Sequence, residues 1–246
     1  MNKKLSKRRL SIITGALAIA GMTLVQAMPG RAVSFSTPDG VEGTPKMETS
    51  GGASRSGGQC TPGVVVKPEE AIAPLVPNTK LGLTVAERPN FFAYIPETTA
   101  KEAAFSLQDE EQNLVYQTRI SLPSKAGIVR ISIPEEVEAL EVGKDYRWFV
   151  EVLCTGEDFD PDNPLADGWV RRTEKNPMLQ SKLEQASTNL ERAMAYAEAG
   201  IWHETASMLV EARQLQPEDS NDWELHWQEL LTSVGLEAIA TQPLAY

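Results

Sequence analysis

Three aspartates at alternate positions, Asp158, Asp160 and Asp162, are the most suggestive grouping of chemically active residues in this sequence. Carboxylates at positions 1, 3 and 5 of a loop are how calcium loops supply oxygen ligands. The pattern breaks at position 12, where Trp169 stands in place of the bidentate glutamate. A solvated loop between two strands explains the same residues, because Asp, Asn and Pro favour turns. Calcium binding and a plain loop therefore stay open as alternatives.

Residues suited to nucleophilic catalysis are sparse. The only histidines, His203 and His226, fall in segments with a helical pattern, and no G-x-S-x-G turn occurs. Both histidines are expected to be packing or surface residues rather than bases. With 34 acidic residues, carboxylate pairs are inevitable and none stands out. An exported carboxylate-dependent hydrolase is therefore only the alternative to a non-enzymatic role.

The two cysteines, Cys60 and Cys154, are expected to form a disulfide. An oxidising compartment favours that pairing, and closing so long a loop would stabilise the fold by about 4–5 kcal/mol. Two separate thiols are the alternative. A zinc site is disfavoured, because zinc takes four ligands and both histidines lie in a different kind of segment.

Residues 1–27 have the order of a cleaved secretory signal peptide. The basic stretch MNKKLSKRRL precedes an apolar run that ends in small residues. This run is shorter than the about 20 residues that span a bilayer, so cleavage before Met28 is expected rather than a retained anchor. The processed chain is then exported, periplasmic or extracellular, and has no stable membrane span.

Net charge narrows the range of partners. The sequence carries −11, and loss of the five basic residues of the signal segment makes the balance −16. A nucleic-acid partner would need a basic surface, and no basic cluster is larger than Arg171-Arg172. The acidic balance instead favours solubility, with cationic partners as the alternative.

Composition divides the processed chain into segments. Residues 28–59 are rich in Gly, Pro, Ser and Thr and are predicted to form a disordered leader. Residues 60–175 hold short runs of period-two alternation, as at Val129, Ile131 and Ile133, with turn residues between them. Six or seven strands without an intervening helix predict an antiparallel β-sandwich that is immunoglobulin-like in style.

Residues 176–246 follow a helical period instead. Helices are expected over residues 177–199, 201–215 and 222–234, so the fold class is α+β by domain, with a three-helix segment after the sandwich. The first two helices resemble a single tetratricopeptide repeat. The residues at the offsets of that repeat, counted from Gly200, are Tyr196, Thr205, Leu209, Ala212 and Pro217. One repeat cannot bury its own apolar face, so these helices must pack on the sandwich or on another chain.

Segments spread over the chain carry a family resemblance. They are GLTVAERPNFFAYIP, FSLQDEEQNLVY, GIVRISIP, LEVGKDYRWFVEVLC, GWVRR and AEAGIWHETASMLVEAR. In these segments the chain resembles an uncharacterised family of exported cyanobacterial proteins, Domain of Unknown Function 928. The resemblance covers residues 60–246 and implies the order of sandwich and helices, but it implies no activity.

These features predict a non-enzymatic, extracytoplasmic protein-interaction module with a protein or peptide partner in the cell envelope. Its candidate partner-binding residues are the helical aromatics Trp202, Trp223 and Trp227, for which core packing is the alternative. The competing classes are the carboxylate-dependent hydrolase and a calcium-stabilised envelope component. No cofactor other than calcium is expected.

Overall fold

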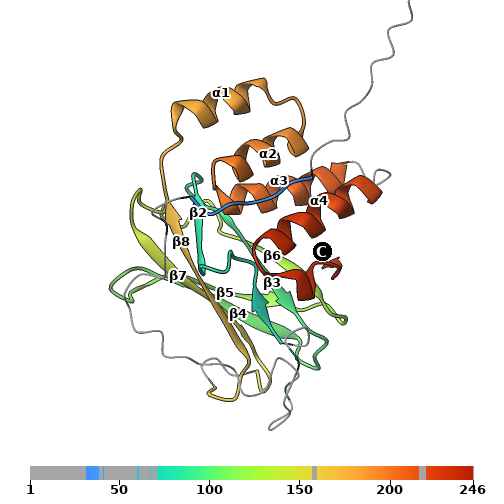
Figure 1. The fold of residues 1–246 in the computed structure, drawn as a ribbon. Helices are drawn as coiled ribbons and strands as arrows, with labels where there is room; N and C mark the ends of the chain where they lie inside the picture. Colours follow the sequence, from blue (N-terminus) through green and yellow to red (C-terminus); the bar gives the residue numbers. More distant parts are fainter. Residues whose placement is uncertain are drawn as a thin grey trace, which may run out of the picture. The chain divides into compact units, whose positions relative to one another are not determined.

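Two β-sheets pack face to face (Figure 1). The four-stranded sheet has the order β1–β3–β6–β9, from Ala73–Pro74, Asn90–Ile95, Gly127–Ser132 and Leu244–Ala245. The five-stranded sheet has the order β2–β8–β7–β4–β5, from Leu81–Thr84, Leu165–Arg172, Asp145–Val152, Glu102–Gln108 and Leu114–Ser121.

The structure, a computed structural model, describes residues 32–38, 41, 60, 67, 71–156, 160–215 and 220–245. The predicted signal peptide, residues 1–27, and the cleavage position before Met28 lie outside the described residues. The chain from Ala32 onward belongs to one compact unit.

Apolar side chains fill the space between the sheets. Phe91 of β3 meets Phe105 of β4 and Trp148 of β7, with ring centroids 5.1 and 5.2 Å away. Gly168 of β8 lies opposite Trp148, and a Cβ at this glycine would come within 2.9 Å of the indole. The absence of a side chain at Gly168 therefore makes room for the largest core residue. The β-sandwich prediction is confirmed.

Two strand pairs are parallel, so the prediction of a wholly antiparallel sandwich is wrong for them. β2 runs parallel to β8 along its whole length, and β9 runs parallel to β6 at Leu244 and Ala245. Antiparallel neighbours can be joined by a tight hairpin, whose turn residues mark their direction in the sequence. The members of these two pairs are far apart in the chain, and no such local signal exists.

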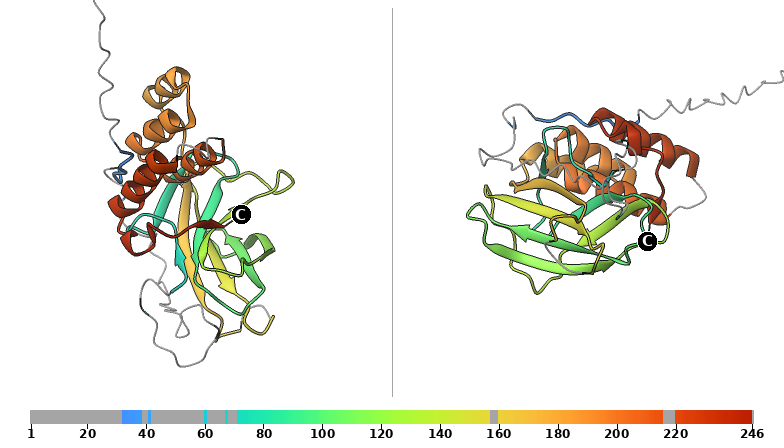
Figure 2. Two further views of the ribbon diagram at one scale, coloured as in Figure 1. Left: turned by 90° about the vertical axis from the view of Figure 1, so that its right-hand side faces the viewer. Right: turned by 90° about the horizontal axis from the view of Figure 1, so that it is seen from below.

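Helices follow strands β1 to β8, and α2, α3 and α4 pack on the face of the four-stranded sheet that points away from the five-stranded sheet, whereas α1 packs with α2 and β2 (Figure 2). They are α1 (Pro177–Gln185), α2 (Asn189–Glu198), α3 (Trp202–Leu215), α4 (Ser220–Ser233) and the short 3-10 helix η3 (Glu237–Ile239). Within the described chain, no helix has both the length and the apolar character that a bilayer crossing needs.

The expected helix over residues 177–199 is two helices, so the three-helix prediction is wrong. α1 ends at an extended residue, Ala186, and α2 begins two residues later with a capping box. In that box the Thr188 hydroxyl accepts from the Glu191 amide at 3.1 Å, and the Glu191 carboxylate accepts from the Thr188 amide at 3.0 Å. These bonds satisfy amides that a new helix start leaves unpaired, so they stabilise the break.

Strand β3 is buried on both faces. Phe91, Ala93 and Ile95 point into the sandwich, whereas Phe92 and Tyr94 belong to a second core shared with the helices. This second core includes apolar residues of α2, α3 and α4. The helical segment therefore packs on the sandwich, which meets the requirement that an isolated repeat bury its apolar face elsewhere.

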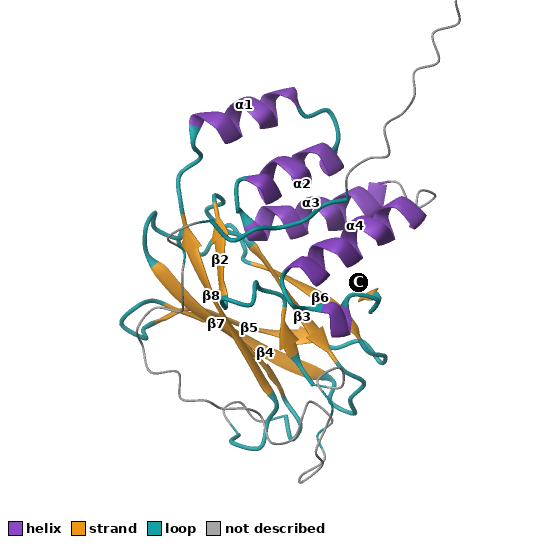
Figure 3. Cartoon of the chain, viewed as in Figure 1, coloured by secondary structure: helices purple, strands orange, loops and turns teal. Residues whose placement is uncertain are grey.

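The prediction of a disordered leader over residues 28–59 is wrong for residues 32–38. This stretch, called the strap below, has no helix or strand and packs against the helices (Figure 3). Val33 and Phe35 are 2% and 5% exposed, and both belong to the second core. Burial of these two apolar side chains against the helices therefore offsets the conformational entropy that a short polar stretch loses when it becomes ordered.

The predicted Cys60–Cys154 disulfide is confirmed, with Cα atoms 5.1 Å apart. Cys154 follows β7 directly, and both cysteines pack against the sandwich core. The bond therefore fastens the chain that precedes the first strand to the end of a central strand.

Candidate peptide-binding groove of the helical layer

Helix α3 begins with a tryptophan that is fully enclosed. Trp202 is 0% exposed, lies in the second core, and donates its indole N–H to the Leu75 carbonyl at 2.8 Å. Its interpretation as an exposed partner anchor is therefore wrong, and the core alternative holds. Helical spacing places an aromatic on a face but does not say whether that face is covered, which is why the sequence left both open.

The residue after it, His203, is buried against the sheets. Its Nδ1 lies 3.0 Å from the Asn90 carbonyl oxygen, which can only accept, so Nδ1 carries the proton. Nε2 is then an acceptor, and it is buried without a hydrogen-bond partner among the described residues. Burial lowers the pKa of His203 to about 4, so the ring is neutral at ordinary pH.

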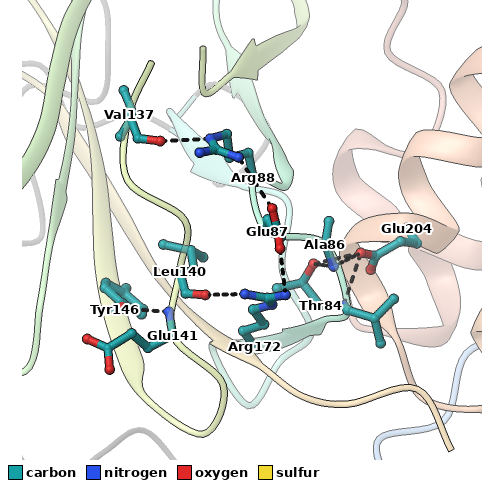
Figure 4. Close-up of polar contacts among 11 residues, drawn as sticks. Thr84, Ala86, Glu87, Arg88, Val137, Leu140, Glu141, Tyr146, Arg172 and Glu204 are labelled. Atoms are coloured by element: carbon teal, nitrogen blue, oxygen red, sulfur yellow. Dashed lines mark hydrogen bonds and ion pairs between the residues drawn. The ribbon is translucent and has the colours of Figure 1, made fainter. Parts of the chain in front are cut away.

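Glu204 completes this polar start of α3 (Figure 4). Its Oε1 accepts from the Thr84 hydroxyl at 2.7 Å and from the amides of Val85 and Ala86 at 3.0 and 2.8 Å. Oε2 has no partner among the described residues. Burial raises the pKa of this carboxyl, because taking a charge out of water is costly. His203 and Glu204 therefore fasten α3 to the ends of β2 and β3, out of reach of a substrate.

Salt bridges and carbonyl contacts fix the loops beside Glu204 (Figure 4). Arg172, at the end of β8, donates to the Leu140 carbonyl at 2.6 Å and pairs with Glu87 at 3.3 Å. Arg88 donates to the Val137 carbonyl at 2.7 Å, so both arginines hold the 133–145 connection against the 85–89 loop. The carboxyl group of Glu204 thus lies beside a loop that these contacts hold in place. This position suits a structural role better than a catalytic one.

The strap packs on α3 and α4, and side chains of α4 bind its backbone; the surface that it covers is called the groove below. The Val33 amide donates to His226 Nδ1 at 3.1 Å, and the Phe35 amide donates to the Ser233 hydroxyl at 3.0 Å. Seven residues separate His226 from Ser233, so the two acceptors share one face of the helix. Alternate amides of the strap are thus paired with alternate turns of α4.

The side chains of the strap alternate between buried and exposed positions with the same two-residue period. Val33 and Phe35 are buried, whereas Ser34 and Ser36 are exposed. The Phe35 ring meets the Trp202 indole edge to face, with centroids 5.2 Å apart at an interplanar angle of 84°. This geometry is favourable between aromatic rings. The groove thus holds an apolar residue and an aromatic two positions later.

The lack of a side chain at Gly200 allows the end of the strap to pack closely against this residue. Gly200 has φ +72°, which glycine adopts readily, and it ends α2 with bonds from its own amide to Ala197 and from the Ile201 amide to Tyr196. A Cβ at Gly200 would lie 2.1 Å from the Pro38 ring. The same residue therefore caps a helix and lets the strap approach it.

Trp223 and Trp227, the other two predicted anchors, stack on each other near the start of α4. Their ring centroids are 5.4 Å apart at 17°, and the Trp223 indole donates to the Leu209 carbonyl at 2.7 Å. Trp227 is 1% exposed and Trp223 is partly buried. Both line a cavity of about 310 Å³. The structure thus stacks these two rings on each other, while all three tryptophans belong to or pack against the second core.

The predicted calcium residues fall in the loop before β8. Asp158 lies outside the described residues, so the structure does not test the three-aspartate site. Asp160 accepts from the Asp162 amide at 3.0 Å and from the Thr155 hydroxyl at 3.3 Å, as in a loop held by its own turn bonds. Among the described residues, no three His, Cys, Asp or Glu side chains are placed to hold a metal ion. Calcium binding stays a prediction.

One cavity bears on the hydrolase alternative. It has a volume of about 130 Å³ and is rich in carboxylates. Its lining consists of Asp109, Glu110, Glu111, Val115, Glu138, Ala139, Glu141, Lys144 and Tyr146. The Asn113 side chain, which donates to Asp109, lowers the pKa of that carboxyl. A general acid needs the opposite shift, so Asp109 is unsuited to that role.

Sequence reasoning missed the residues that hold the strap. His226 and Ser233 look like ordinary polar positions of an amphipathic helix, and Val33 and Phe35 stand in a stretch dominated by turn formers. The available signal was the alternation Val-Ser-Phe-Ser, which favours a half-buried extended segment. Four residues are too few for that signal to outweigh composition.

Comparisons with known proteins found a family model and similar solved structures. The family model described as Domain of Unknown Function (DUF928) matches residues 50–244. No curated protein matches the sequence. Among solved structures, the chain is similar to the CARDB domain of a Pyrococcus furiosus protein, solved in complex with di-metal ions. That match has 12% identity and a TM-score of 0.28, and covers 42% of this chain and 92% of that one.

Most of the sequence, including every described strand and helix except the last residue of β9, lies within one family match, whereas the strap lies outside it. The chain belongs to the family Domain of Unknown Function (DUF928).

Proposed function

We propose that the protein is a non-enzymatic, extracytoplasmic interaction module whose helical layer binds a peptide segment. The observation that supports this is the strap, because the protein's own residues 32–38 already occupy a groove between α3 and α4 as a peptide ligand would. The strap is joined to the sandwich through a long stretch of chain, so its place in the groove is one that another peptide could take.

The chemistry of the groove defines the partner. His226 and Ser233 bind main-chain amides, which every peptide except one with proline there can offer. The pockets for Val33 and Phe35 select an apolar residue followed two positions later by an aromatic. Main-chain bonds that give affinity and alternate side chains that give specificity are a recurring mode of peptide recognition. The partner is thus an envelope protein with an exposed apolar-x-aromatic segment.

The finer architecture that we propose for the helices is a tetratricopeptide-like repeat. A short turn at Gly200 joins α2 to α3, and α4 follows as the first helix of a second repeat would. Helical repeats of this kind form extended concave surfaces for ligands. For the sandwich, an immunoglobulin-like style is proposed on the strength of its two packed sheets.

The proposed extracytoplasmic location rests on two features. The Cys60–Cys154 disulfide is consistent with an exported protein, since such bonds persist in oxidising compartments. The basic and apolar order of residues 1–27 supports cleavage of a signal peptide.

A peptide-binding assay tests the proposal. The chain without residues 1–27 would be made with the strap substitutions Val33→Ser and Phe35→Ser, which remove both buried side chains and leave the groove intact. We expect a fluorescein-labelled AVSFSTP peptide, the strap sequence, to bind this variant with a saturable rise in anisotropy. The wild-type chain should bind it much more weakly, because a tethered strap competes at an effective concentration in the millimolar range.

Two control peptides sharpen the result. AVAFATP changes only the exposed serines and should bind as well as AVSFSTP, whereas ASSSSTP lacks both anchors and should not bind. If the folded strap variant, checked by circular dichroism, binds neither AVSFSTP nor AVAFATP, or binds ASSSSTP equally, the groove is not a peptide site.

A further inference from the structure

A cavity at the other end of α4 from Ser233 has the features of a second binding site. It has a volume of about 310 Å³ and lies among the end of α3, the start of α4 and the segment before β9. The lining residues that bear on a ligand are Arg213, Trp223, Glu224 and Trp227. None of the residues that hold the strap lines it, so the site does not depend on the groove.

Arg213 brings to this cavity a guanidinium that pairs with no carboxylate among the described residues. Its guanidinium lies over the Trp223 ring, 4.5 Å from the centroid, and makes no ion pair within the described chain. Its Nη1 is buried and has no acceptor there, although the side chain as a whole is partly exposed. By contrast, Arg147 and Arg171 each bind a carboxylate. A buried donor without an acceptor costs free energy, which a ligand oxygen would recover.

Trp227 supplies a second donor without an acceptor. It is 1% exposed, and its indole N–H has no hydrogen-bond partner among the described residues. Of the two tryptophans that line the cavity, Trp223 donates to the Leu209 carbonyl, so only Trp227 has an unmet donor there. Stacking of the two rings and the guanidinium holds all three groups in fixed positions.

We propose that this cavity, the tryptophan pocket, binds a carboxylate. The guanidinium of Arg213 would donate to its oxygens, since charge-assisted bonds from arginine to carboxylate are strong, and the Trp227 indole would donate a further bond. Glu224 in the wall repels a negative ligand and keeps the affinity moderate. The volume accommodates a small dicarboxylate or an acidic side chain of a peptide, and these two sources share one chemistry.

Nuclear magnetic resonance titration of the chain without residues 1–27 tests the proposal. The probes are glutarate and the blocked peptide acetyl-Gly-Gly-Glu-Gly-Gly-amide, followed through the indole N–H signals of the tryptophans and the Nε–H signal of Arg213. We expect saturable shifts at Trp227 and Arg213 with at least one probe. A response to glutarate alone identifies a free carboxylate as the ligand, and a response to the peptide alone identifies an acidic segment. The matched Gln peptide should give no shift.

Substitutions separate this site from general charge effects. Arg213→Gln should weaken binding about tenfold or more, and Arg213→Lys, which keeps the charge and the aliphatic stem, should retain part of it. Glu224→Gln should tighten binding. Arg130, exposed on β6, is the matched control, and Arg130→Gln should leave affinity unchanged. No saturable shift with either probe, or equal weakening by Arg213→Gln and Arg130→Gln in folded proteins, overturns the proposal.

Discussion

The two faces of strand β3 border interiors of different character. The face toward the five-stranded sheet meets a core built of apolar side chains, with Phe91, Phe105 and Trp148 at its centre. The face toward the helices also meets apolar residues, but the first turns of α3, which packs there, bury His203, Glu204, Thr205 and Ser207, the first two beside the ends of β2 and β3. An apolar core needs only shape and area, whereas buried polar groups need particular partners. The packing of the sandwich core should therefore depend little on pH, whereas the interface with the helices should depend on it.

The largest effect is expected from the disulfide of the sandwich. Cys60→Ser with Cys154→Ser should lower the free energy of unfolding by about 4–5 kcal/mol, because the unfolded chain regains the freedom that the loop closure removed. Urea unfolding followed by tryptophan fluorescence measures this, and reducing the wild type with dithiothreitol should give the same midpoint. An unchanged midpoint in both cases would show that the bond does not stabilise the fold.

The next effect concerns the polar interface and depends on pH. The pKa of His203 falls from 6.5 in the unfolded chain to about 4 in the fold. Above pH 6.5 the ring is neutral in both states. As pH falls from 6.5 to about 4, the unfolded state binds a proton that the fold refuses, and stability drops by up to about 3 kcal/mol. His203→Gln should flatten this slope in unfolding curves at pH 7.5, 5.5 and 4.

Glu204 acts in the opposite direction and provides the internal control. Its folded pKa is raised above the model-compound value of 4.5, so its contribution is complete below pH 4.5 and is lost as pH rises through the raised pKa. Glu204→Gln keeps an acceptor for Thr84, Val85 and Ala86 without a charge, and should gain stability relative to the wild type as pH rises. A wild-type slope unchanged by both substitutions would contradict the assigned burial of the pair.

A smaller effect is expected from the strap. Phe35→Ala removes a ring that is 5% exposed. Because the strap can detach while the rest of the fold stays intact, the loss of unfolding free energy should be less than about 3 kcal/mol, the lower limit for Phe→Ala in a hydrophobic core. Hydrogen exchange at the Val33 and Phe35 amides should accelerate strongly, while the β7 amides keep their protection. Ser34→Ala is the matched control and should change neither rate. Equal acceleration in β7 would mean that the strap and the sandwich open together.

The smallest effects are expected from two glycine substitutions, one in the sandwich core and one where α3 meets β2. A Cβ at Gly168 would meet the Trp148 indole at 2.9 Å, and a Cβ at Gly82 would meet His203 Nε2 at 2.8 Å. Gly168→Ala and Gly82→Ala should each cost about 1–3 kcal/mol through overpacking. Thermal unfolding at pH 7.5 measures both. Because Gly82→Ala displaces the imidazole, only this variant should also alter the pH slope, and an altered slope in Gly168→Ala would break the comparison.

Much of the sandwich could be predicted from the sequence, because its signals are local. Alternation at Val129 and Ile131 and around Trp148 marked β6 and β7, and the two cysteines predicted their bond. The helix over residues 201–215 was placed almost to the residue by its period and by Gly200. The break before α2 could have been read from the Thr188-x-x-Glu191 capping box, which the long apolar stripe obscured.

What the sequence could not predict depends on distant partners. The direction of β9 against β6, the strap on α4 and the three bonds to Glu204 all join segments more than a hundred residues apart. For the candidate sites, the sequence shows which residue types are present but not what surrounds each side chain in the fold. Trp202 and Trp223 look alike in a helical pattern, yet one is enclosed by the sheet and the other lines a cavity.

The position of the strap also imposes a temporal order on folding. Val33 precedes His226 by 193 residues and Phe35 precedes Ser233 by 198, so in a chain made from its N-terminus the strap is produced long before the residues that bind it. Strands β1 to β8 can pair before α4 exists, whereas the strap must wait for it. Protection of the Val33 amide from hydrogen exchange therefore reports that α4 has docked.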